Sequence, residues 1–188
     1  NFSKRNIYYK WMSRGENNLY RSNAHMSSHW VRIAADLYLL TNEREYIKVI
    51  EKFMRNFNEN IENSKTKQGV KYWKSVWSKN TPTYQDVSHG NAVVSTLVYL
   101  DEKNILDLKD LLNDLTYTFK TTIWKNTNTY SKYVDGSDVG TGWFSDGYVT
   151  LGRFDKELQK RFEKHKVGRS TQFYAQCAKN ALLLNAHE

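Results

Sequence analysis

The chain has 188 residues, enough for one domain with a sizeable core, and aromatic residues make up 14% of it, which excludes a disordered protein. No apolar run reaches the roughly 18 residues that a membrane-spanning helix needs, and the single cysteine, Cys177, excludes an internal disulfide. The formal net charge of +8 favours an anionic partner. Nucleic acid is the less favoured one, because no recognised nucleic-acid motif is present.

We expect residues 1–188 to form a single domain. The chain begins at Asn1 and not at Met, and no signal peptide is visible in it. A leader or more of a larger domain is therefore expected to precede it. The sequence does not indicate an oligomeric state.

Two kinds of predicted helix alternate along the chain. The first kind is apolar on nearly every side and is expected to be surrounded by protein: residues 24–40, 86–100 and 170–185. The second kind sets an apolar stripe against charged residues and is expected to have one wet face: residues 43–62, 105–124 and 155–166. Polar turns separate them, and capping side chains lie near these turns at Thr41, Asp101 and Asp155.

The alternation predicts stacked helical hairpins. An inner helix, a polar turn and an outer helix recur roughly every 60 residues. We therefore predict an all-α fold of αα-hairpin repeats that form an α/α toroid or an incomplete arc of one. Apolar helices would form its inner layer and amphipathic helices its outer layer. A third, short inner helix is expected near Trp143 and Asp146.

Polar side chains gather where the inner helices are predicted to begin. They are Asn23, His25, His29, Tyr84, Gln85, Asp86, His89, Asn91 and Arg169. In stacked hairpins the inner helices begin on the same face, so these side chains are expected to converge. Helix N-termini carry a positive partial charge and free N–H groups, so this face should favour anions.

The pair Asp86 and His89 is the most specific feature of that face. Asp86 is expected to cap the second inner helix, and its carboxylate could also orient His89, one turn later, as a catalytic base. The competing interpretation of His89 is a hydrogen-bonded core histidine. Gly90 follows it, and glycine costs about 1 kcal/mol inside a helix, so we expect close approach by another backbone or a ligand.

His25 and His29 lie four residues apart on one face of a helix, a spacing that can bind zinc. No glutamate lies beside them as in a zinc protease helix, and no third ligand is obvious. We therefore predict no metal and no cofactor. A polar contact from Asn23 or His25 to a ligand, and a structural role for either, both stay open.

Aromatic residues lie beside cations in the loops that precede the inner helices. Tyr72, Trp73 and Trp77 occupy a lysine-rich loop, and Trp143 lies in a glycine-rich one. Such faces suit sugar rings that bear carboxylates, because the ring stacks while the charge pairs. For any single tryptophan, packing in the core is the main alternative. Nucleobases would stack equally well.

Charged outer helices, apolar inner ones, the loop Y-W-K-S-V-W and the motif Q-D-V-S-H-G-N resemble the α/α-toroid polysaccharide lyases. The resemblance covers the general pattern over much of the chain, and Asp86-x-x-His89-Gly90 is its most specific local motif. It implies cleavage of a uronate polymer by β-elimination. One group neutralises the uronate carboxylate, a Tyr or His removes the C5 proton, and a Tyr or His protonates the leaving oxygen.

The resemblance also implies roles for particular residues. His89 would be the base or the carboxylate neutraliser, and Tyr84 or Tyr72 would be the phenol that serves as base and acid. The substrate carboxylate would be held by Asn23, His25, Asn91 and Arg169. Further substrate contacts would come from Asp86, Trp73, Trp77 and Trp143. The implied partner is an acidic polysaccharide, and the implied location is outside the cell, in the periplasm or on the cell surface.

Two other functions stay open at this point. One is an inverting glycoside hydrolase on the same scaffold, with Asp86 and Asp146 as the acid–base pair. Asp135 and Asp138 are further carboxylates in that region, but D-G-S-D more often marks a turn. The other is a non-catalytic helical-repeat module that binds an anionic glycan, nucleic acid or protein.

Overall fold

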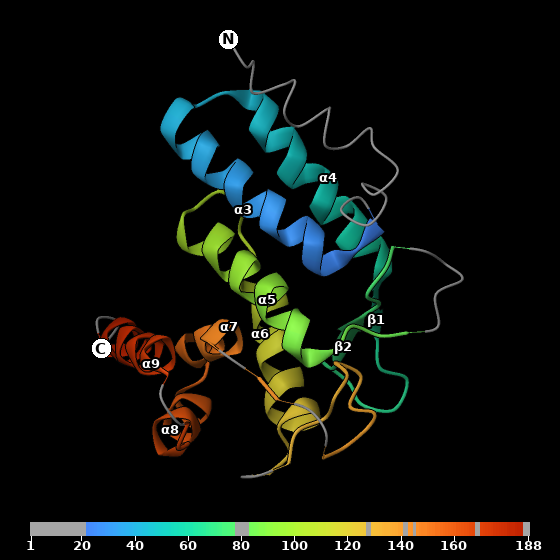
Figure 1. Cartoon of the computed structure of the whole chain (residues 1–188), viewed down its shortest axis with the longest axis vertical. Coiled ribbons are helices and arrows are strands. Elements are labelled where there is room, and N and C mark those ends of the chain that lie inside the picture. Colours follow the sequence, from blue (N-terminus) through green and yellow to red (C-terminus); the bar gives the residue numbers. More distant parts are fainter. Residues whose placement is uncertain are drawn as a thin grey trace.

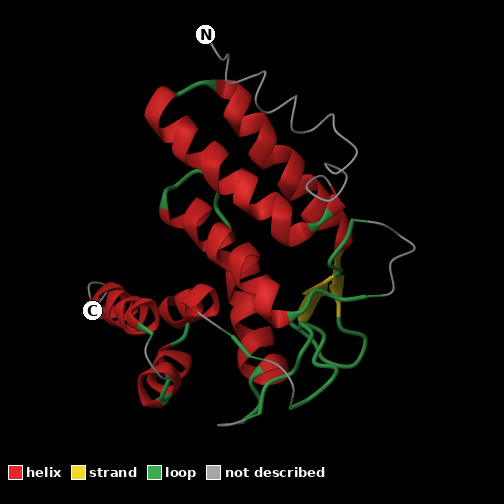
Figure 2. Cartoon of the chain, in the orientation of Figure 1, coloured by secondary structure: helices red, strands yellow, loops and turns green. Residues whose placement is uncertain are grey.

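The computed structural model describes residues 22–77, 83–126, 129–140, 143–144, 146–167 and 170–185. Within these ranges the protein is mostly helical, with one small sheet, which confirms the predicted all-α class (Figures 1 and 2). The helices are α3 (Ala24–Thr41), α4 (Arg44–Asn60), α5 (Val87–Glu102), α6 (Lys109–Thr118), α7 (Asp146–Val149), α8 (Lys156–Lys164) and α9 (Thr171–Asn185). Short helical segments η1 (Phe119–Ile123, π-helical) and η2 (Thr150–Phe154, 3-10) continue α6 and α7. None of the helices described is long and apolar enough to cross a membrane.

The predicted alternation of helix types holds in part. Helix α5 is largely buried, as expected of an inner helix. The expectation that α9 is surrounded by protein is wrong, because among the described residues it buries Phe173, Cys177 and Asn180 and leaves Leu182 72% exposed. Helix α4 buries one stripe of side chains and exposes charged residues on its other face, because its apolar residues recur at helical spacing. Helices α3 and α5 are apolar on more of their circumference. Helix α3 packs against α4 and α5, α5 packs against α7, and α7 packs against α9. The apolar helices thus form a row, with the amphipathic ones beside it.

The row does not keep one orientation. Helices α3, α4, α5 and α6 lie across the view of Figure 1, whereas α9 is seen nearly along its axis. Helices α3 and α5 lie side by side and both begin on the side of the small sheet. The first turns of these two helices are therefore neighbours, as the stacked-hairpin pattern requires.

Side-chain caps fix where several helices begin. Asn23 Oδ1 accepts the Met26 N–H at the start of α3, and Asp86 Oδ1 accepts the His89 N–H at the start of α5. Asp155 caps α8 in the same way. Asp101 instead accepts the N–H of Leu108, the residue that precedes α6.

An extended ribbon joins the first turns of α3 and α5. Strands β1 (Ile61–Asn63) and β2 (Lys71–Trp73) pair antiparallel. Beyond β2 the chain forms single bridges from Lys74 to Tyr84 and from Val76 to Asn23. The same extended segment therefore holds the cap of α3 and the residues that lead into α5.

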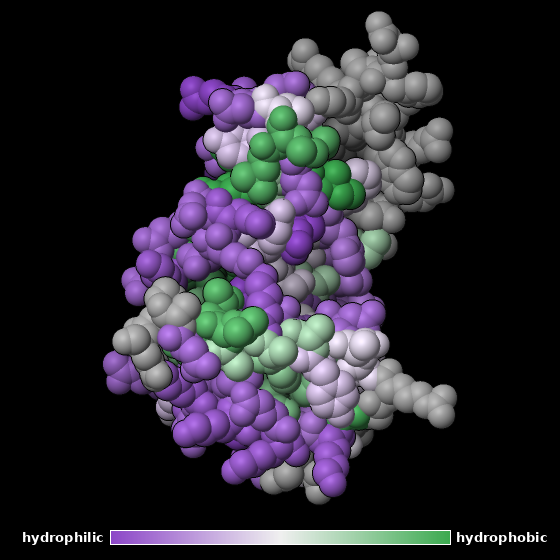
Figure 3. Space-filling model, turned by 90° about the vertical axis from the view of Figure 1, so that its left-hand side faces the viewer, coloured by the Kyte–Doolittle hydropathy of each residue, from purple (hydrophilic) through white to green (hydrophobic). Residues whose placement is uncertain are grey.

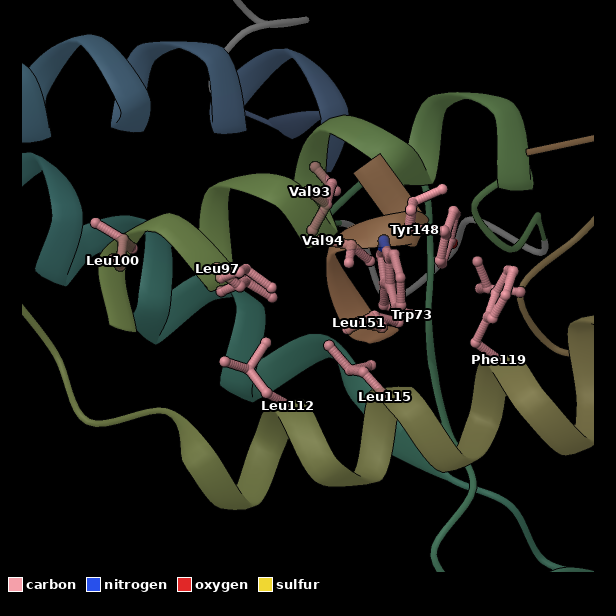
Figure 4. Close-up of a cluster of buried hydrophobic side chains, with 14 of the residues drawn as sticks. Trp73, Val93, Val94, Leu97, Leu100, Leu112, Leu115, Phe119, Tyr148 and Leu151 are labelled. Atoms are coloured by element: carbon pink, nitrogen blue, oxygen red, sulfur yellow. The ribbon is translucent and has the colours of Figure 1, made fainter. Parts of the chain in front are cut away.

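The core lies between α5, α6, α7 and this ribbon. Trp73 lies among the buried side chains of these helices, close to Tyr148 and Leu151 (Figure 4). Phe119 stacks on Tyr148 with a centroid distance of 4.7 Å. Since these residues come from distant parts of the sequence, their burial ties the ribbon to the helices that it precedes.

Candidate functional site at the helix mouths

The first turn of α5 holds an aspartate–histidine pair. His89 Nδ1 lies 2.8 Å from both carboxylate oxygens of Asp86. The carboxylate also accepts bonds from the His89 backbone N–H, from the Ser88 hydroxyl and from Gln85 Nε2. The His89 side chain keeps 57% of its surface exposed. In the part of the chain that the structure describes, its Nε2 has no hydrogen-bond partner.

The carboxylate of Asp86 is held in its ionised form. Burial acts to raise the pKa of Asp86, but the hydrogen bonds from Ser88 and from the backbone and ring of His89 outweigh it, so the pKa is lowered. An ionised carboxylate only accepts hydrogen bonds. His89 must therefore donate from Nδ1, which leaves a basic Nε2 directed away from Asp86.

His25 and His29 of α3 complete a cluster of three histidines. The ring of His25 lies 4.6 Å, centroid to centroid, from that of His89, and its Nε2 lies 3.0 Å from Nε2 of His29. Burial, followed by the charges of His29 and His89, lowers the pKa of His25 from 6.5 to about 4. His25 is therefore neutral at pH 7 and contributes one hydrogen-bond donor and one acceptor beside His89.

The phenols of Tyr84 and Tyr72 form a second cluster. Along the extended segment before α5, side chains alternate, so Tyr84 and Asp86 lie on one side while Gln85 points into the core and is 2% exposed. Tyr84 donates to Glu62 Oε2 at 3.1 Å, and the rings of Tyr84 and Tyr72 meet edge to face at 4.9 Å. Lys74 pairs with the other oxygen of Glu62.

This environment favours the protonated form of both phenols. Burial, followed by the hydrogen bond to Glu62, raises the pKa of Tyr84 to about 12. Burial and the charge of Glu62 also raise the pKa of Tyr72. A phenol that keeps its proton at neutral pH can donate one but is a poor base. The structure therefore favours His89 over either tyrosine as the base.

Asn91 and Gly90 have structural tasks. Asn91 is buried, its Oδ1 accepts the N–H of Tyr148 at 3.1 Å, and its Nδ2 bonds carbonyl oxygens of its own helix. The close approach predicted at Gly90 is made by the protein itself, because a Cβ there would lie 2.5 Å from the Tyr148 hydroxyl. Asn91 thus joins α5 to α7 and does not reach the exposed face, contrary to the carboxylate-binding role expected for it.

Asn23 lies at the start of α3, where it caps the helix; it was expected to hold the substrate carboxylate. Its side chain caps α3, and its backbone bridges to Val76. The oxygen of this amide is therefore already used by the Met26 N–H, whereas His25, two residues later, faces the cluster.

The tryptophans divide between the core and the surface. Trp73 is 1% exposed and packs on Phe57, so neither of its faces is open to a sugar ring, contrary to the sequence-based expectation. Trp77 also packs edge to face on Phe57 and Phe53. Trp143 is 58% exposed, just before α7, and keeps a face available. Arg169 lies outside the described residues.

The glycine-rich segment before α7 behaves as a turn. Asp135 Oδ1 accepts bonds from the backbone and hydroxyl of Ser137, Gly136 has φ +90°, and Asp138 pairs with Lys132. Asp86 bridges to Tyr133 at the base of this turn. Asp135 and Asp138 are therefore used locally, as the D-G-S-D pattern predicted.

Two contributors to the site were not predicted. Ser88 binds the Asp86 carboxylate, and its place between Asp86 and His89 was a signal for this contact. Glu62 binds Tyr84 and Lys74. The pairing of β1 with β2 brings it beside them, and the sequence carries no local signal for that pairing. Among the described residues, no group of three or more His, Cys, Asp or Glu side chains could hold a metal ion.

The fold and the site define only a broad class of protein. It is a basic helical domain in which a carboxylate binds a histidine, beside the first turns of two neighbouring helices. Comparison of the chain with protein-family models, with curated proteins and with solved structures finds no match. The assignment of a function therefore rests on the residues themselves.

Proposed function

We propose that the protein is an enzyme that cleaves a uronate-containing polysaccharide by β-elimination, with His89 as the base. The observation that carries the proposal is the Asp86–His89 pair: the His89 side chain is exposed beside the neutral His25, and its Nε2 has no partner among the described residues. An imidazole oriented by a carboxylate is the usual device for removing a proton near neutral pH.

The proposed reaction uses His89 of the histidine cluster and Tyr84 of the second cluster. His89 Nε2 takes the C5 proton of the uronate, the bond from C4 to the leaving oxygen breaks, and a C4=C5 double bond forms. Tyr84, which keeps its proton at neutral pH, is the proposed donor to the leaving oxygen; its hydroxyl, which donates to Glu62 in the free protein, would turn to that oxygen and release its proton there. The first turns of α3 and α5 supply positive partial charge beside the substrate carboxylate, and the negative charge that develops during the reaction is stabilised by such preorganised dipoles.

The α/α-toroid or arc arrangement is part of the same proposal. It is supported by the row α3–α5–α7–α9 and by the position of His25 and His89 at neighbouring helix starts. An acidic polysaccharide as partner is supported by the net charge of +8. A substrate of this kind suits an enzyme that works outside the cell, in the periplasm or at the cell surface.

The hydrolase alternative has weaker support. A general acid among carboxylates needs a raised pKa, whereas the pKa of Asp86 is lowered and its oxygens are bonded to His89 and Ser88. A hydrolase would give saturated products and more reducing ends. A binding module would release neither product.

The test is an ultraviolet absorbance assay with polygalacturonate, alginate, hyaluronan and heparan sulfate as separate substrates. The wild type should release an absorbing unsaturated uronate from at least one polymer, and His89→Ala should lower the rate by about a hundredfold or more. His165→Gln is the matched control, since His165 packs on Phe144 and Trp124 and not in the cluster. An absorbance trace that stays flat with every polymer, or an unchanged rate in His89→Ala, would refute the proposal.

A further inference from the structure

A pocket of about 370 Å³ opens at the end of α5 opposite to His89. It is an open pocket lined by residues of the C-terminal part of α5, of the first turns of α6, of η2 and of α9. Its lining combines polar and charged side chains with apolar ones: Asp101, Glu102, Lys109, Asn113 and Arg153 together with Val98, Phe154 and Leu183. Since a helix rises about 1.5 Å per residue, the pocket lies roughly 15–20 Å from His89 along α5. It is thus separate from the candidate catalytic cluster.

The carboxylates at the pocket are already bound. Glu102 Oε2 accepts from Nη1 of Arg153 at 2.7 Å, and its Oε1 accepts from Nζ of Lys179 at 2.6 Å. Burial acts to raise the pKa of Glu102, but these two hydrogen bonds outweigh it and the pKa is lowered. Asp101 Oδ1 accepts the N–H of Leu108. Both negative charges are therefore satisfied by protein groups.

The cations at the pocket are only partly used. The side chain of Arg153 is 8% exposed, and it bonds Glu102 through Nη1 and Asn180 through Nε. In the described part of the chain, neither its Nη2 nor Nζ of Lys109 has a partner. Lys109 also begins α6, whose first turn adds positive partial charge and also carries Asp110. Among the side chains that line the pocket, Lys109 and Arg153 balance Asp101 and Glu102, and Glu102 is further paired by Lys179 from outside the lining.

We propose that this pocket binds a small amphipathic anion, a carboxylate carried by an apolar ring. The carboxylate would lie between Arg153 Nη2 and Lys109 Nζ, with Asn113 as a further donor, because guanidinium and ammonium groups bind carboxylates through short charge-assisted hydrogen bonds. The ring would lie on Val98, Phe154 and Leu183. The volume suits a molecule of about one ring, at the small end of ligand pockets.

The side of the molecule on which α9 lies is otherwise mostly hydrophilic, with separate apolar patches (Figure 3). A ligand that carried only charge would gain nothing from Phe154 and Leu183, and a purely apolar one would leave the Arg153 and Lys109 donors unpaired. The combination of polar and apolar lining therefore selects against both kinds of ligand.

Titration of the whole chain with benzoate, followed by calorimetry or by amide chemical shifts, tests the proposal. Benzoate should bind saturably, and benzamide, its neutral isostere, should bind at least tenfold more weakly. Lys109→Ala should weaken benzoate binding at least fivefold, and this variant should fold normally because Lys109 is exposed. Lys52→Ala, an exposed lysine on α4, is the matched control and should not change the affinity.

Three results would overturn the proposal: no saturable benzoate binding, equal affinity for benzamide, or an unchanged affinity in Lys109→Ala. A further variant distinguishes binding in this pocket from binding at the histidine cluster. His89→Ala should bind benzoate as the wild type does, and a loss of binding in that variant would place the ligand at the histidine cluster instead. Because this test uses no polysaccharide, its outcome is independent of the proposed elimination reaction.

Discussion

The carboxylate of Asp86 has two tasks, and they can be separated. It caps α5 through the His89 N–H, and it holds the His89 ring through Nδ1. A capping role needs only a side-chain acceptor, which asparagine also supplies. Holding the ring with Nε2 free of its proton needs a group that cannot donate, which favours the ionised carboxylate over an amide.

Asp86→Asn should therefore leave α5 capped and the protein stable, while its elimination activity is lost. We expect a change of no more than about 1 kcal/mol in the free energy of unfolding, because the cap is retained. The elimination rate should fall by about a hundredfold or more, because the amide can donate to Nδ1 and favour the wrong tautomer. Denaturant titration and the absorbance assay measure the two effects. Asp86→Ala should lose activity and about 1–2 kcal/mol of stability together; near-normal activity in Asp86→Asn would contradict the role of the carboxylate.

The lowered pKa of His25 predicts a pH dependence of stability. The unfolded chain binds a proton at His25 below about pH 6.5, whereas the folded chain binds it only near pH 4. Stability from this group is therefore full above pH 6.5 and is lost as the pH falls towards 4. The half-exposed ring is screened by solvent, so the loss should be about 1–2 kcal/mol. His25→Asn should remove this contribution, and equal slopes of unfolding free energy against pH in the two proteins would contradict it.

At the level of elements, the contact between α5 and α7 fixes the position of the first turn of α5. The Asn91 side chain bonds the Tyr148 N–H, and the Gly147 backbone lies against the Asn91 backbone. A Cβ on Gly147 would lie 2.2 Å from the Asn91 carbonyl oxygen, so no side chain fits there. The spacing of the two helices thus depends on a glycine.

Gly147→Ala should therefore destabilise the protein by about 2 kcal/mol or more, because backbone atoms must move apart. The matched control is Gly140→Ala, where φ is +94° but nothing lies within 4 Å of the added Cβ. It should cost about 1 kcal/mol, for the backbone conformation alone. Urea denaturation of both variants measures the difference. If Gly147→Ala cost no more than Gly140→Ala, the close packing of α7 on α5 would be refuted.

At the level of the whole molecule, positive charge and the row of helices belong to the same proposal. A net charge of +8 attracts a polyanion over a distance set by the ionic strength. Binding of polyanions releases counterions, so the logarithm of the affinity should fall linearly with the logarithm of the salt concentration.

This salt dependence can be measured with polygalacturonate and its methyl ester. Between about 50 and 200 mM salt, the affinity for polygalacturonate should fall by roughly tenfold or more. The neutral ester should bind weakly and without a salt slope. An affinity for polygalacturonate that does not change with salt would contradict the electrostatic recognition proposed here.

The sequence predicted the parts of this molecule that depend on local patterns. Helical spacing of apolar residues indicated α3, α4, α5 and α9, and the Asp86 cap was readable from its residue type. The burial of Trp73 and Asn91 could not be predicted from the sequence, because it depends on which distant segments pack together. The same applies to Glu62, which meets Tyr84 only through the pairing of β1 with β2.

The state of His89 is the feature on which the proposed chemistry depends most directly. Long-range proton–nitrogen correlation spectra of the ¹⁵N-labelled protein near pH 8 distinguish a protonated ring nitrogen from a bare one. We expect His89 to carry its proton on Nδ1 and to leave Nε2 bare, and Asp86→Asn to shift the proton towards Nε2. A proton on Nε2 in the wild type would contradict the assignment of His89 as a base held by Asp86.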